Sequence, residues 1–269
     1  MESVKIRDIE IKENERIDDL QLKGYKIIQN TDGFCFGMDA VLVANYAKTK
    51  KNDIAVDLGT GTCIIPLIIN AKNSLQKMYA VEIQKEVADM ARRSVEMNGL
   101  EEKIEVINTD INSLFEYFSE KGIEMKNRVD VVVSNPPYMS KSEGLHNETE
   151  KKRISRHEVS CDIDDICRTT GALLKHQGKF YLVHRPSRLA DIIESLRKYK
   201  LEPKEMRFVY PNMKKPANLI LIKAVKAAKP ELRMKKPLIV YNDDGSYTDE
   251  IHEIYGLDQN REVKNDEQK

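Results

Sequence analysis

The chain has 269 residues, of which 41% are apolar and 33% are charged, enough for one sizeable hydrophobic core. No apolar run approaches the roughly 20 residues that a membrane-spanning helix needs, and the N-terminus lacks the basic and then apolar layout of a signal peptide. The five histidines and four cysteines show no metal-ligand spacing. We therefore expect a monomeric, cytoplasmic protein with reduced cysteines, no metal and no membrane segment.

The net charge of zero hides an uneven distribution along the chain. Residues 1–140 carry 18 Lys and Arg against 23 Asp and Glu, residues 141–236 carry 23 against 12, and residues 237–269 carry 3 against 9. A basic segment in a neutral protein suits a polyanion that contacts one face, although solvated helix surfaces give the same pattern. Charge alone leaves both alternatives open.

Strand-like and helix-like segments alternate through the middle of the chain. The expected strands are DIAVDL (53–58), KMYAVEI (77–83), KIEVINTD (103–110), RVDVVVSN (128–135), GKFYLVH (178–184), MRFVY (206–210) and ANLILIKAV (217–225). A helical pattern follows each of the first five strands. This alternation predicts an α/β fold with a mostly parallel, seven-stranded sheet and helices on both faces.

The two ends of the chain lie outside this alternation. Residues 1–48 are expected to form an N-terminal extension with a strand and one helix, and residues 49–228 the main domain. Residues 229–269 are expected to form a C-terminal hairpin, turning at Asp244 and Gly245, and a disordered tail.

The segment DLGTGT (57–62) joins the first strand of the alternation to its first helix. Gly59 and Gly61 permit a tight turn and a close approach of a ligand to the backbone. The third glycine of a dinucleotide-binding fingerprint and the Lys-Ser/Thr of a phosphate-binding loop are absent. Many α/β proteins carry glycines at this turn, so the pair alone is weak evidence for a cofactor.

Acidic residues at three successive strand ends strengthen the evidence for a cofactor site. Asp57 and Glu82 end the first and second strands, and Asp110 ends the third. A carboxylate at Glu82 can accept hydrogen bonds from both hydroxyls of a ribose, and Asp110 can accept from an adenine amino group. Acids in this pocket favour a cation, so S-adenosylmethionine, with its sulfonium and ammonium, fits better than NAD.

The fourth strand ends at Asn135, and Pro136, Pro137 and Tyr138 follow it. The exocyclic amine of adenine is a poor nucleophile, because its lone pair is delocalised into the ring. The side-chain oxygen of Asn135 and the carbonyl of Pro136 can hold its two N–H groups and free that lone pair. Pro137 stiffens the loop, and Tyr138 offers a face on which a base can stack. The alternative is a stiff Pro-Pro turn without chemistry.

Together, DLGTGT and NPPY resemble the Rossmann-like, class I S-adenosylmethionine-dependent methyltransferases that act on adenine N6. QNTDGFCFGMDAVLVANYAK (29–48) and ISRHE (154–158) resemble more closely the tRNA1(Val) (adenine-N6)-methyltransferase family, and the similarity covers about residues 15–250. The resemblance implies methylation of the adenine at position 37 of a tRNA, beside the anticodon.

By position, the resemblance also implies roles for individual residues. The cofactor would be bound by Asp39, Asp57, Gly59, Thr60, Gly61, Glu82, Asp110 and Asn135. Asn135, Pro136, Pro137 and Tyr138 would hold the target base. Cys63 stands where many members of the wider superfamily have Gly or Ala, so the glycine turn departs from the common pattern there.

Basic residues on the loops after the fourth and later strands are candidates for contact with tRNA phosphates. They are Lys151, Lys152, Arg153, Arg156, Arg185, Arg188, Lys214 and Lys215. Each alone is typical of a solvated surface, whereas together they fit a grip on the RNA backbone.

Two other functions remain open. Methylation of a glutamine in a release factor also uses Asn-Pro-Pro-Tyr, but those enzymes carry a helical substrate domain before the glycine turn, and only 56 residues precede Asp57 here. A catalytically silent RNA-binding protein on the same scaffold is the second, although it would have no reason to keep the motif and the acids intact.

Overall fold

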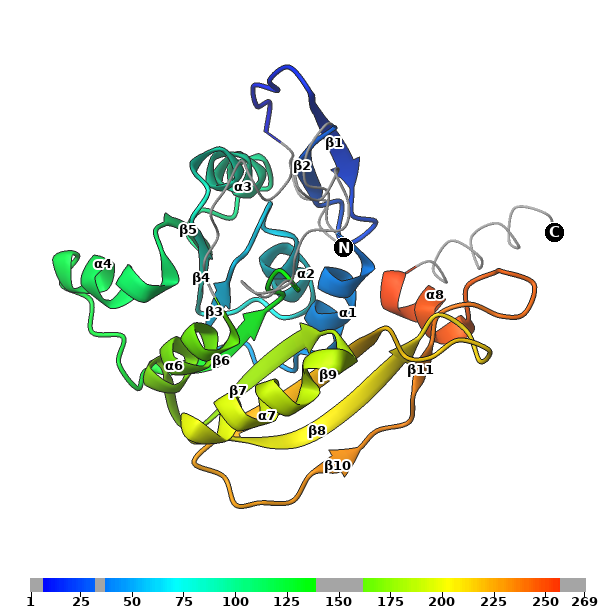
Figure 1. Ribbon diagram of the computed structural model, residues 1–269. Coiled ribbons are helices and arrows are strands. Elements are labelled where there is room, and N and C mark those ends of the chain that lie inside the picture. Colours follow the sequence, from blue (N-terminus) through cyan, green and yellow to red (C-terminus); the bar gives the residue numbers. More distant parts are fainter. Residues whose placement is uncertain (1–6, 32–36, 139–161, 257–269) are drawn as a thin grey trace, which may run out of the picture.

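One mixed sheet forms the centre of this computed structural model, which describes residues 7–31, 37–138 and 162–256 (Figure 1). Within those residues the sheet has nine strands, in the order β10 (Arg233–Met234), β8 (Leu201–Tyr210), β9 (Leu219–Lys226), β7 (Leu174–His184), β6 (Val129–Ser134), β3 (Ile54–Leu58), β4 (Lys77–Glu82) and β5 (Ile104–Asn108), with β11 (Leu238–Ile239) also paired to β8. β9 is antiparallel to both of its neighbours, and the other pairs are parallel. β3 to β9 confirm the predicted, mostly parallel sheet of seven strands, to which β10 and β11 are added.

Helices cover both faces of the sheet, as predicted. On one face lie α1 (Met38–Tyr46), α2 (Ile64–Lys72) and α3 (Lys85–Met97), and on the other lie α4 (Leu114–Glu120), α6 (Ile163–Leu173) and α7 (Leu189–Lys198). The alternation along β6 explains this arrangement, because Val131 and Val133 belong to the first core and Val132 to the second. A parallel strand buried on both faces is mostly apolar, which is why the centre of β6 is a run of three valines, Val131–Val133.

The N-terminal part differs in detail from the expected strand and helix. β1 (Glu15–Asp19) and β2 (Lys26–Asn30) form a separate two-stranded antiparallel sheet before α1. Ile27 and Ile28 of β2 are fully buried, and the Ile28 N–H donates to the Ser94 hydroxyl of α3 at 2.9 Å. β1 was missed because its sequence, ERIDD, is mostly exposed and has no apolar periodicity.

The C-terminal segment turns where predicted but continues differently. The Asn242 N–H donates to the Ser246 carbonyl at 2.8 Å, and Tyr241 and Tyr247 form a single antiparallel bridge. The chain then enters α8 (Asp249–Tyr255), where a hairpin strand was expected. α8 packs beside α1 and buries Ile251 in the core. This burial explains why the segment is helical. The expected disordered tail lies outside the described residues.

Candidate active site

The carboxyl ends of four neighbouring parallel strands, β6, β3, β4 and β5, meet at one edge of the sheet. Leu58 at the end of β3 lies opposite Val81 of β4 and Ser134 of β6. β4 and β5 extend the sheet on one side of β3, whereas β6 lies on the other side. The gap between β3 and β6 is therefore a topological switch point, the place where open α/β sheets bind ligands.

The glycine turn folds back onto β4. Gly59 and Gly61 have φ values of +79° and +58°, which glycine adopts without strain. The N–H groups of Gly59 and Thr60 donate to the Val81 carbonyl at 3.0 and 2.9 Å. Cys63 also has a left-handed φ of +77°, so the residue that departs from the common pattern occupies a backbone position that favours glycine.

Glu82 holds this turn in place. Its carboxylate accepts from the N–H of Gly61 and from the N–H of Gln84, both at 2.9 Å. The side chain is 6% exposed, at the end of β4. A carboxylate is an acceptor of the kind that ribose hydroxyls require.

Asp57 is fully buried beside the turn. Neither of its carboxylate oxygens has a hydrogen-bond partner among the described residues, and the buried hydroxyl oxygens of Thr60 and Thr62 also lack one. Burial raises the pKa of Asp57 to about 7, the Thr60 hydroxyl nearby partly offsets the rise, and Glu82 adds to it. Buried oxygens without partners are costly unless a donor or cation satisfies them, so this cluster is suited to a cationic ligand.

The strand that was expected to end at Asp110 ends earlier, so Asp110 lies beyond it. β5 ends at Asn108, and Asp110 instead caps the short 3-10 helix η1 (Ile111–Ser113). Its side chain accepts from the Asn112 N–H at 2.8 Å. The residue remains at the same edge of the sheet, one strand beyond Glu82.

Asn135 follows β6 directly, and its neighbour Ser134 bonds to Leu58, the residue before the glycine turn. The Ser134 hydroxyl donates to the Leu58 carbonyl at 2.7 Å, which holds the ends of β6 and β3 together. Pro136 is buried and Pro137 is exposed. The Tyr138 hydroxyl lies 3.0 Å from Asn135 Oδ1 and 2.5 Å from Asp39 Oδ2.

Three residues surround Tyr138. Asp39, the second residue of α1, bonds its hydroxyl, the Arg185 guanidinium lies 4.8 Å from its ring centroid, and the His184 ring meets it edge-on at 5.2 Å. Burial lowers the pKa of His184 to about 4, so the imidazole is neutral, and its Nδ1 accepts from the Arg185 N–H at 2.8 Å. Sequence reasoning missed His184, because a lone histidine at a strand end carries no signal of its own.

The predicted RNA contacts divide into two groups. Lys151, Lys152, Arg153 and Arg156 lie outside the described residues. Arg185, Arg188, Lys214 and Lys215 follow the ends of β7 and β8, at the same edge of the sheet as Asn135.

Three of these four cations, Arg185, Arg188 and Lys214, have different partners. Arg188 forms an ion pair with Asp191 at 2.7 Å, and Lys214 forms one with Asp243 at 3.1 Å. Arg185 donates to the Asn218 carbonyl at 3.2 Å and contacts Tyr138. The structure therefore brings Arg185 to the NPPY segment.

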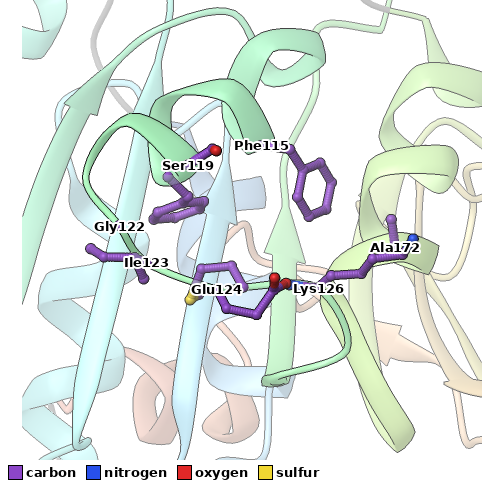
Figure 2. Close-up of a pocket in the computed structure, with 9 residues that line it drawn as sticks. Phe115, Ser119, Gly122, Ile123, Glu124, Lys126 and Ala172 are labelled. Carbon is purple, nitrogen blue, oxygen red and sulfur yellow. The ribbon is translucent and has the colours of Figure 1, made fainter.

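The described residues hold neither a metal-ligand cluster nor a membrane-spanning helix, and a hollow near α4 lies away from Asn135. No three His, Cys, Asp or Glu side chains among them gather as metal ligands, and none of their helices is long and apolar enough to cross a bilayer. A hollow of about 520 Å³ lies near α4. Figure 2 shows Phe115, Ile123 and Ala172 among the residues that line it. Because these residues precede the starts of β6 and β7, the hollow lies at the edge of the sheet opposite Asn135.

The mixed sheet with helices on both faces is the fold of class I methyltransferases. The family model of the methyltransferase small domain matches residues 37–201, and the chain belongs to this family.

Relatives and solved structures agree with this assignment. Curated relatives with the name tRNA1(Val) (adenine(37)-N6)-methyltransferase are 22–29% identical to this chain. The one from Parabacteroides distasonis is 28% identical over 213 residues, which are 78% of this chain and 86% of the relative. A predicted O-methyltransferase from Agrobacterium tumefaciens has a similar structure, with a TM-score of 0.65 and 23% identity over 81% of this chain and 96% of that one. The structure of P. horikoshii TYW2 in complex with MeSAdo gives a TM-score of 0.54 and 12% identity over 81% and 73% of the two chains.

Proposed function

We propose that this protein transfers the methyl group of S-adenosylmethionine to the exocyclic N6 amine of an adenine in tRNA. The observation that carries the proposal is Asn135 at the end of β6, directly beside the glycine turn at the end of β3. A base held by Asn135 would therefore lie next to a cofactor held by the turn. The names of the relatives support tRNA as the substrate and position 37 as the site.

The residues at the strand ends fit this cofactor. Glu82 is held at the end of β4 by the N–H groups of Gly61 and Gln84, and its carboxylate would accept from the ribose hydroxyls. Asp110 would accept from the adenine amino group. An ammonium group would satisfy the carboxylate oxygens of Asp57, which have no hydrogen-bond partner among the described residues. When bound, the cofactor supplies an electrophilic methyl group on its sulfonium.

The chain itself contributes orientation and electrostatics. The Asn135 oxygen and the Pro136 carbonyl would accept the two N–H groups of the amine, drawing the nitrogen toward tetrahedral geometry and directing its lone pair at the methyl group. The methylated nitrogen is acidic, so it loses its proton without a dedicated strong base. Stacking on Tyr138 would use the face of the ring that Arg185 does not cover.

Cofactor affinity should rise with pH. Burial raises the pKa of Asp57 from its ordinary 3.8 to about 7, so the free fold favours the protonated carboxyl group. The contribution of this protonated group to the stability of the free fold is therefore full below pH 3.8 and is lost as the pH rises through 7. A cationic ligand favours the ionised carboxylate, so binding near pH 6 expels a proton. Calorimetry should show affinity increasing by up to about tenfold per pH unit between pH 5 and 7.

The Asp57→Asn variant is the control for this prediction, because it retains the side-chain shape but cannot titrate. Its affinity for the cofactor should be lower and should lose the rise between pH 5 and 7. An affinity of the unaltered protein that does not change with pH would show that Asp57 does not face the cofactor's charge.

Binding of tRNA should depend on Arg185 more than on Arg188. Phosphate contacts make log affinity fall with log salt, and removing one contact should flatten that slope by about 0.7–0.9. Arg188 is the matched control, because it lies three residues away and its guanidinium is paired with Asp191. We expect Arg185→Ala to flatten the slope and Arg188→Ala to leave it almost unchanged; equal slopes in both variants would place the RNA elsewhere.

The loop that contains Lys151, Lys152, Arg153 and Arg156 is proposed as a second contact with the tRNA backbone. We also propose that the protein acts as a monomer and in the cytoplasm, where tRNA is modified. The same salt titration tests this loop. It is repeated with a triple variant that removes the charges of Lys151, Lys152 and Arg153.

The experiment that tests the proposed function compares two substrates. The protein is incubated with methyl-labelled cofactor and either unmodified bulk tRNA or a release factor, the substrate of the other enzymes with an Asn-Pro-Pro-Tyr motif. Label should enter tRNA. Label in the release factor alone would overturn the proposal, and label in neither would favour a silent scaffold.

A further inference from the structure

The Tyr138 hydroxyl lies between two acceptors. Asp39 Oδ2 is 2.5 Å away and Asn135 Oδ1 is 3.0 Å away, and a phenol has one proton to donate. Asp39 is 99 positions earlier in the sequence and belongs to α1, so this contact links the N-terminal helix to the end of β6. The two acceptors compete for one proton.

Asp39 is the stronger competitor. A hydrogen bond to a carboxylate is shorter and roughly twice as strong as one to a neutral amide, and the two distances follow that order. The other oxygen of Asp39 accepts from the Ala40 N–H at 2.9 Å, which fixes the carboxylate at the start of α1. Burial and Asp39 both raise the pKa of Tyr138, so the phenol keeps its proton.

The position of this proton decides what Asn135 can do. With the proton directed to Asp39, the Tyr138 oxygen presents only lone pairs to Asn135. The Asn135 oxygen is then not engaged by a donor, and the amide can also turn over so that its NH₂ donates to Tyr138 and its oxygen points away. In both orientations the oxygen remains available for an incoming amine.

We propose that Asp39 is a positioning residue for methyl transfer: by accepting the Tyr138 proton, it keeps the Asn135 oxygen free to accept from the target amine. The inference rests on the proposed function and adds to it a residue that acts through Tyr138. Without Asp39, Tyr138 would donate to Asn135 and occupy the acceptor that the reaction needs.

A double-mutant cycle tests this role through a rescue. Single-turnover methylation of tRNA is measured for the unaltered protein, Asp39→Ala, Tyr138→Phe and the double variant. Asp39→Ala should be slower by about 10–100-fold, since one acceptor in the transition state is compromised. Tyr138→Phe removes the competing donor and should cost less than about fivefold. The double variant should recover to the rate of Tyr138→Phe alone.

A structural role for Asp39 predicts a different result. Losses that add in the double variant would overturn the inference, because removing the Tyr138 hydroxyl would then not relieve the loss of Asp39. Asp39→Asn, which keeps a neutral acceptor, should fall between Asp39→Ala and the unaltered protein. In this role Asp39 acts on Tyr138 and not on the cofactor, so cofactor affinity and thermal melting should stay close to normal in all variants. A loss confined to cofactor affinity would overturn the inference in favour of the cofactor role that the resemblance implies.

The outcome also separates this inference from the proposed function. An unaltered protein that does not methylate tRNA overturns the proposed function and this inference with it. An active protein whose variants show additive losses overturns the inference alone.

Discussion

Replacing Asn135 with Ala should lower the single-turnover rate of tRNA methylation by about 10²–10³-fold, the typical cost of losing one preorganised electrostatic contact. The fold should persist, because the Ser134 hydroxyl and the ladder between β3 and β6 hold the strand end without the Asn135 side chain. Cofactor affinity should change little, since the side-chain oxygen serves the target amine. Rapid-quench methylation with the variant in excess over tRNA measures this rate.

Three further variants make this prediction specific. Asn135→Asp keeps an acceptor and should retain part of the rate. Tyr138→Phe keeps the ring for stacking and should be tolerated far better than Tyr138→Ala. Near-normal turnover in Asn135→Ala would mean that the NPPY segment is only a stiff turn.

The second large effect is expected on cofactor binding. Glu82→Ala should weaken the binding of S-adenosylmethionine by about 1.5–3 kcal/mol, the range for a hydrogen bond to a charged group. Loss of the carboxylate removes the proposed ribose acceptor, and it also releases the N–H groups of Gly61 and Gln84 that it now holds. Isothermal titration calorimetry provides the measurement.

Glu86→Ala is the matched control for Glu82. Glu86 is exposed and lies in the first turn of α3, four residues after Glu82. Its replacement with Ala removes the same charge as Glu82→Ala. Its cofactor affinity should stay near normal. If the affinity of Glu82→Ala were equally normal, Glu82 would be a brace for the turn with no contact to the cofactor.

The central fold could be predicted from the sequence because its strands are buried on both faces. β3, β4 and β6 are largely apolar, and each has a polar residue at or near its carboxyl end: Asp57, Glu82 and Ser134. The same logic fails at the ends of the chain. β10 and β11 have two residues each, too few to show a period, and β1 is mostly exposed.

The sequence indicates which residues lie at the strand ends, and their roles in a site stay predictions; several of their contacts were not expected. Glu82 and Asn135 lie at the ends of β4 and β6, on either side of β3, because parallel strands in register bring their carboxyl ends together. The contact of Asp39 with Tyr138 joins two helix-and-loop positions whose spacing carries no periodic signal. The full burial of Asp57 depends on packing from both faces of the sheet, and the strand pattern alone does not reveal how strongly its pKa rises.

The central claim is that Asn135 presents the N6 amine of an adenine to the methyl donor. The most direct measurement is mass spectrometry of the nucleosides from tRNA that the protein has methylated with a deuterated methyl group, followed by mapping of the labelled fragment. The account predicts a single labelled nucleoside, N6-methyladenosine, at position 37 beside the anticodon. A deuterated methyl group on a ring nitrogen, on a ribose or on another base would contradict it.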